Sequence, residues 1–261
     1  MAGKFRGVVV LLASAAVLSG CMAGPPQPTQ RQMARIDRAL ASAPGTAQPS
    51  VVVATEVAFA RMARDDGQWT AFRHFAADDG VLHGAGGPIA AKAWLASQSN
   101  PPAAVQWAPR IVWMSCDGML AVSQGRFRDP DGMVGTFNTV WQRQSDGTYR
   151  YLYDGGEKDD PQPVRRPETE PGEGEIVVTA IDSIRGEVAD CRAPDGPPPP
   201  PIPEPLYPEG TRSGGGVSPD GTLVWSWVHL PDGRREITSS IYRDGSWEEA
   251  TRFDFGSKPA G

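Results

Sequence analysis

The stretch that decides the fold class is residues 105–154, VQWAPRIVWMSCDGMLAVSQGRFRDPDGMVGTFNTVWQRQSDGTYRYLYD. It contains four strand-like runs, 105–116, 119–128, 133–144 and 148–154, separated by three short turns that each contain Asp-Gly. Asp-Gly between two β-rich runs is a strong hairpin signal, because glycine readily takes the positive φ that such turns need. The stretch therefore predicts an antiparallel meander.

The residues before this meander predict helices. Apolar residues at 53, 57, 60 and 62–63 recur at helical spacing and predict a helix with one buried face that ends near Asp65. Aromatic residues spaced by three predict a second short helix over 68–75. A short strand over 80–83 follows. Pro88 then opens a third predicted helix over 89–98, at a first-turn position where proline is tolerated.

The rest of the chain is rich in turns and linkers. Gly (30) and Pro (26) are too frequent for one seamless helical domain, and 39% apolar residues are too many for a disordered chain. Runs at 223–230, 236–242 and 247–255 predict a second meander. We divide the chain into a signal peptide (1–20), a Pro-rich tether with a short helix (21–49), a first domain (50–155), a linker (156–174), a strand pair (175–192), a Pro-rich spacer (193–212), a C-terminal β-meander (213–256) and a tail (257–261).

The first residues have the pattern of an export signal. Lys4 and Arg6 precede an apolar run, 8–18, that is too short to span a bilayer. The following Leu-Ser-Gly-Cys, ending at Cys21, resembles a bacterial lipobox, which implies lipidation of Cys21. Met22 at the next position implies the periplasmic face of the outer membrane of a Gram-negative bacterium. The alternative is an ordinary secretory signal that contains a cysteine.

Two further cysteines, Cys116 and Cys191, could form a disulfide in an exported protein. Two separate thiols are the alternative, because bridging depends on the Cα separation and on the direction of the side chains. The sequence leaves both options open.

Several segments of the first domain carry a family resemblance. They are Glu56-Val57-Ala58-Phe59-Ala60, Trp69-Thr70-Ala71-Phe72, residues 75–80, Gln124-Gly125-Arg126-Phe127, Gly135-Thr136-Phe137, residues 140–144 and Asp146-Gly147-Thr148-Tyr149. With them, 51–155 resembles the NTF2-like superfamily, in particular its SnoaL-like and DUF4440-type members. The resemblance implies an α+β fold in which helices pack into a cone-shaped, curved antiparallel sheet with an interior pocket, here followed by the small C-terminal β-meander. Members often dimerise through the outer face of the sheet.

The resemblance also bears on catalysis. Ketosteroid isomerases of this superfamily place a catalytic Asp a few residues beyond an Asp-Asp turn. On this sequence that position falls at about Gly84, beside His83, so the expected carboxylate is missing. His83 is then the best single candidate for a base near neutral pH, with Asp79 and His74 as weaker candidates. The alternative is that these side chains are merely solvated or hydrogen-bonded.

The sequence gives little support for a metal, phosphate or nucleic-acid site. The scattered histidines fit no zinc pattern, and no cofactor is expected. The glycines at 84–87 lack the Lys and Ser/Thr of a phosphate loop. An acidic chain of net charge −6 without a basic block argues against a nucleic-acid partner.

An aromatic-lined pocket is the remaining candidate. The predicted lining residues are Phe127, Phe137, Trp141, Tyr151 and Trp113. The leading hypothesis is a lipid-anchored envelope protein that binds a small apolar ligand, or an envelope partner or second copy, without catalysis. The alternatives are a SnoaL- or isomerase-type enzyme that uses His83 as its base, and a structural module that docks partners through its C-terminal sheet.

Overall fold

The computed structural model describes residues 47–164, 183–192, 196–203 and 205–256. All of them belong to one compact unit, 44–261. The predicted signal peptide, Cys21, the short helix of the tether and the strand expected at 175–180 lie outside the described residues.

Two of the three predicted helices form as expected. They are α2 (Pro49–Asp66) and α3 (Gln68–Phe75). The buried face of α2 differs in part from the predicted one. Val52, Glu56, Phe59 and Ala63 are buried, and Val53 and Met62 pack against the same core, whereas Val57 is exposed. The polar Glu56 thus sits in the middle of the buried stripe.

The third helix is present but begins later and is shorter than predicted. Residues Gly87–Ala90 form strand β2, and the helix α4 (Ala91–Leu95) begins only after it. Strand β2 lies at the edge of its sheet, where Pro88 does not interrupt a ladder on both sides. Proline is compatible with an edge strand as well as with the first turn of a helix, so Pro88 alone does not mark a helix start.

A mixed sheet of seven strands forms the centre of the fold. Its other strands are β1 (Ala76–Gly84), β3 (Gln106–Met114), β4 (Leu120–Arg128), β5 (Val134–Arg143), β6 (Tyr149–Lys158) and β7 (Arg185–Val188). The order is β2-β1-β6-β5-β4-β3-β7, so the predicted meander β3–β6 is confirmed. Strand β1 pairs in parallel with β6, and β7 pairs in parallel with β3.

A second, antiparallel sheet follows in the chain. It contains β8 (Arg212–Val217), β9 (Leu223–His229), β10 (Arg235–Arg243) and β11 (Ser246–Phe255), in the order β11-β10-β9-β8. Strand β8 was not predicted, since Gly214, Gly215 and Gly216 have low β propensity. The glycines make room for indoles of the neighbouring strand: a Cβ at Gly214 would lie 2.7 Å from Nε1 of Trp227.

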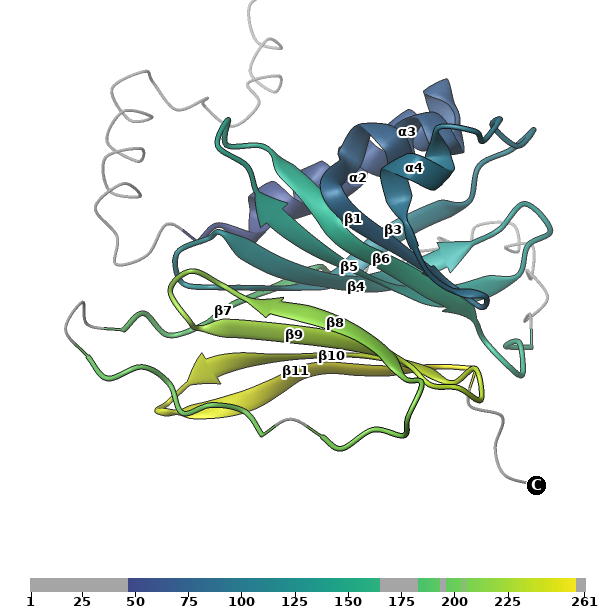
Figure 1. The fold of residues 1–261 in the computed structure, drawn as a ribbon. Helices are drawn as coiled ribbons and strands as arrows, with labels where there is room; N and C mark the ends of the chain where they lie inside the picture. Colours follow the sequence, from purple (N-terminus) through teal and green to yellow (C-terminus); the bar gives the residue numbers. More distant parts are fainter. Residues whose placement is uncertain (1–46, 165–182, 193–195, 204, 257–261) are drawn as a thin grey trace, which may run out of the picture. The chain divides into compact units, whose positions relative to one another are not determined.

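The seven-stranded sheet is covered on both faces (Figure 1). Helices α2, α3 and α4 contact strands β3, β4, β6 and β1 on one face, over a core that includes Phe59, Trp141 and Tyr151. The second sheet packs on the other face, over a core that includes Trp113, Tyr153 and Trp225. The C-terminal strands therefore share a hydrophobic core with the first sheet.

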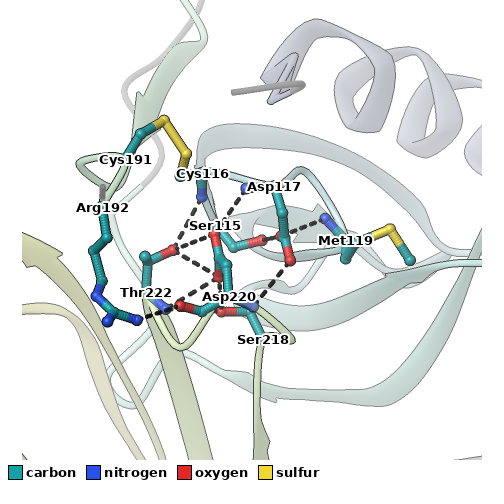
Figure 2. The surroundings of a disulfide bond; sticks show 9 residues. All are labelled: Ser115, Cys116, Asp117, Met119, Cys191, Arg192, Ser218, Asp220 and Thr222. Carbon is teal, nitrogen blue, oxygen red and sulfur yellow. Dashed lines mark hydrogen bonds between the residues drawn. A yellow bond between two sulfur atoms is a disulfide. The ribbon is translucent and has the colours of Figure 1, made fainter. Parts of the chain in front are cut away.

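Two turns of the same pattern meet where the sheets join (Figure 2). Each is a Ser-x-Asp-Gly turn, at 115–118 and at 218–221. The backbone N–H of Asp117 donates to the carboxylate of Asp220 at 2.8 Å, and the N–H of Asp220 donates to that of Asp117 at 3.1 Å. A disulfide joins Cys116 in the first turn to Cys191, just beyond β7. This junction ties three distant parts of the chain together.

Candidate functional site

A cavity of about 390 Å³ lies between the helices and one end of the seven-stranded sheet. Six of its lining residues are aromatic: Trp69, Phe72, Trp94, Trp107, Phe127 and Phe137. The other lining residues are Gln68, Leu82, His83, Gly84, Ile89, Val105, Asp154 and Gly156. Gly84 and Ile89 are exposed and form part of the rim. The cavity has the size and apolar character of a small-molecule site.

Two glycines shape the sheet wall of the cavity. In the pairing of β4 with β5, Gly125 lies opposite Phe137 and Phe127 lies opposite Gly135. A Cβ at Gly125 would lie 2.5 Å from the Phe137 ring, and a Cβ at Gly135 would collide with the Phe127 ring. Each phenyl ring therefore occupies the space that a side chain opposite would fill, and both rings lie against the sheet.

Asp154 is the only Asp, Glu, Lys or Arg among the residues that line this cavity. A bulge in β6 turns its side chain toward the helices. Val140 pairs with Tyr153 but Trp141 pairs with Tyr151, so Leu152 is the extra residue. Leu152 and Tyr153 both pack toward the second sheet, and the alternation is shifted beyond them.

A buried carboxylate, Glu56, lies behind the cavity wall. It accepts a hydrogen bond from the Ser123 hydroxyl at 2.5 Å and one from the indole N–H of Trp141 at 3.1 Å. Its second oxygen accepts from the indole N–H of Trp107 at 3.1 Å. Trp107 also lines the cavity, so Glu56 fixes the orientation of one cavity wall.

Both carboxyl groups hold protons more tightly than usual. Burial raises the pKa of Glu56 to about 7, and the neighbouring charge of Asp154 contributes to the rise, against the hydrogen bonds of Ser123, Trp141 and Trp107. Burial also raises the pKa of Asp154 to about 6, although the Thr139 hydroxyl, 2.8 Å from Oδ2, favours the charged form. Near pH 7 Asp154 is therefore mostly ionised, whereas Glu56 is about half protonated.

His83 is buried between the cavity and the second sheet. Its Nδ1 lies 3.0 Å from the Tyr153 hydroxyl, and its Nε2 lies 3.1 Å from Nδ1 of His229. Burial, with the charges of Arg235 and Arg212, lowers the pKa of His83 to about 3. Both ring nitrogens have protein partners, and the ring is neutral near pH 7, so His83 has no nitrogen left for a substrate in this arrangement.

The predicted site residues fall in three places. Phe127 and Phe137 line the cavity. Trp141 and Tyr151 are fully buried in the core beneath the helices, and Trp113 is buried between the sheets, so these three do not line the cavity. His74 is exposed and contacts Phe75, and Asp79 is exposed on β1. The structure therefore does not bring His74, Asp79 and His83 together as a catalytic set.

Sequence reasoning missed Asp154 and Glu56. If side chains alternated strictly along β6, Asp154 would lie on the opposite face of the sheet from Tyr151. The bulge at Leu152 places both on the same face, and it leaves no clear signal in the sequence. Glu56 appeared only as part of a family segment, although its position on the Val52-Phe59-Ala63 stripe was a usable signal.

Within the described ranges, no three His, Cys, Asp or Glu residues form a group that could hold a metal ion. None of the helices in those ranges has the length and apolar character needed to span a membrane. Comparison with known proteins finds no matching protein-family model and no matching curated protein.

Proposed function

We propose that the protein binds a small, mostly apolar molecule in the aromatic cavity, without catalysis, as a lipid-anchored protein of the bacterial envelope. The observation that supports this is the cavity itself: about 390 Å³, with six aromatic side chains and one ionisable carboxyl. Burial of an apolar ligand there would be favoured at roughly 25 cal/mol per Å² of apolar surface. Envelope attachment through Cys21 rests on the lipobox-like sequence alone.

The element order supports a cone-shaped, NTF2-like first domain as part of this proposal. The chain forms in turn two helices, the β1–β2 hairpin, a short helix and the β3–β6 meander. The last strand of the meander, β6, then pairs with β1. The face of the seven-stranded sheet through which such domains often dimerise is covered by the second sheet. We therefore propose a ligand in the cavity and no homodimer through that face.

The proposal is tested by filling the rim of the cavity. Gly84 is exposed there, and a Cβ added to it meets nothing within 4 Å, so Gly84→Phe is expected to fold and to obstruct the cavity. Gly86 in the same turn is equally free of neighbours and does not line the cavity, so Gly86→Phe is the matched control. We expect Gly84→Phe to weaken binding of naphthalenemethanol, measured by calorimetry, by about tenfold or more, and Gly86→Phe to leave it unchanged. Equal binding by both variants contradicts the proposal, as does failure of the unmodified protein to bind both this alcohol and its amine analogue.

One observation favours a second candidate, a proton-transfer enzyme. Asp154 combines an apolar site with a pKa raised by burial to about 6, a combination suited to a general base near neutral pH. In this candidate function Asp154, and not His83, is the general base. The expected result is exchange of the α-protons of an apolar cyclic ketone in heavy water, followed by NMR, with loss of exchange in Asp154→Asn. Exchange that persists in Asp154→Asn would exclude this candidate.

A further inference from the structure

The charges around the cavity are unbalanced. Two carboxylates, Asp154 and Glu56, lie in or behind its wall, and no lysine or arginine is among the lining residues. The hydrogen bonds that reach these carboxylates from described residues come from a threonine, a serine and two tryptophans, all neutral donors. Buried carboxylates are ordinarily paired with a cation, so this site has a deficit of positive charge.

The two arginines whose charges act on His83 are engaged elsewhere. Arg235 pairs with Glu157 and donates to the backbone carbonyl of His83, and its guanidinium lies over the Phe255 ring. Arg212 lies against the β1–β2 turn, with its guanidinium 3.5 Å from the carbonyl of Gly86. Neither side chain lines the cavity. His83, which does line it, is neutral near pH 7 because its pKa is lowered to about 3.

One carboxylate oxygen of Asp154 is available as a hydrogen-bond acceptor. The hydrogen bond from Thr139 goes to Oδ2, and no hydrogen bond from the rest of the described chain reaches Oδ1. Oδ1 is also absent from the buried polar atoms that lack a partner, which is consistent with its facing the cavity. It can accept a hydrogen bond from a molecule bound among the aromatic rings.

The aromatic walls suit a cation as well as an apolar group. Trp69 and Trp94 contact each other edge to face with ring centroids 5.1 Å apart. The Phe72 ring lies 5.4 Å from that of Trp69 and 5.9 Å from that of Trp107, measured between centroids. Faces of aromatic rings attract a desolvated cation, most strongly in tryptophan. Such walls hold an apolar body and stabilise a positive group attached to it.

We propose that the ligand of this cavity is an organic cation, a protonated amine attached to an apolar or aromatic body, with its N–H donated to Oδ1 of Asp154. This rests on the proposed binding function and specifies the class of ligand. The carboxylate of Asp154 orients the amine, and the aromatic rings enclose the apolar body. Anionic ligands are excluded by the same charge.

The test compares three probes of nearly the same shape by calorimetry near neutral pH: naphthylmethylamine, naphthalenemethanol and naphthoic acid. We expect the amine to bind about tenfold to a hundredfold more tightly than the alcohol, as a charge-assisted hydrogen bond in an apolar site would give, and the acid not to bind. Asp154→Asn should remove the preference for the amine over the alcohol, and continued binding of the alcohol, whose O–H the asparagine oxygen can still accept, shows that the cavity is intact.

Two further variants complete the test. Thr139→Val leaves the Asp154 carboxylate in place and should keep the preference for the amine. Asp79→Asn removes an exposed negative charge on β1, a different strand from the one that carries Asp154, and should leave the affinities of all three probes unchanged. Equal binding of amine and alcohol, or a preference that survives Asp154→Asn, overturns the proposal while leaving the binding function in place. Failure of all three probes to bind overturns the binding function itself.

Discussion

Replacing Cys116 and Cys191 together with serine is expected to lower the free energy of unfolding by about 4 kcal/mol. The disulfide joins residues 75 positions apart, and a cross-link over a loop of that length removes a large part of the conformational entropy of the unfolded chain. It also fastens the segment after β7 to the turn between β3 and β4. Urea denaturation of the double variant and of the oxidised protein measures the difference.

Reduction provides the control for this prediction. The oxidised protein treated with dithiothreitol should unfold at the same urea concentration as the double serine variant, because both lack the cross-link and differ little in packing. The reciprocal hydrogen bonds of Asp117 and Asp220 stay available in both. An unchanged unfolding midpoint in the double variant would show that the bond contributes little to stability.

The second large effect is a pH dependence of stability that Glu56 produces. Its pKa is about 7 in the folded protein against 4.5 for the free side chain. Between these values the folded state binds more protons than the unfolded state, so the free energy of unfolding falls as the pH rises. The contribution of Glu56 is present in full below pH 4.5 and is lost by about pH 7, a change of about 3 kcal/mol.

Glu56→Gln isolates this contribution. The amide cannot titrate, so the stability difference between the two proteins should shift by about 3 kcal/mol between pH 4.5 and pH 7, in favour of the variant at the higher pH. The variant also turns an N–H toward one of the donors Ser123, Trp107 or Trp141, which lowers its stability at both pH values and cancels in the comparison. Urea denaturation at the two pH values measures the shift, with Asp79→Asn as a surface control. A constant difference would contradict the prediction.

The strand order of the meander could be predicted because its turns have their own chemistry. Gly132 and Gly147 take positive φ, of 83° each, in turns closed by backbone hydrogen bonds, as Asp-Gly in these positions indicates. The helices α2 and α3 followed from apolar spacing. Strand β8 did not, because indoles of β9 lie over its glycines, a contact between strands that no local pattern records.

The candidate site was predicted only in part. Phe127 and Phe137 were expected in a pocket and line the cavity, because each alternates with glycine along its strand. Asp154 was missed because one extra residue, Leu152, reverses the faces of everything after it in β6. Glu56 was missed because a charged residue on a buried helix stripe is rare, and its partners Ser123 and Trp141 are 67 and 85 positions away.

The paired turns at 115–118 and 218–221 exchange equivalent hydrogen bonds, as identical surfaces do across the two-fold axis of a dimer. Here both partners belong to one polypeptide. A layer supplied by a second molecule would leave the sheet on dilution below the dissociation constant, whereas a layer supplied by the same chain has a fixed effective concentration. The covering of the seven-stranded sheet is therefore independent of how much of the protein is present.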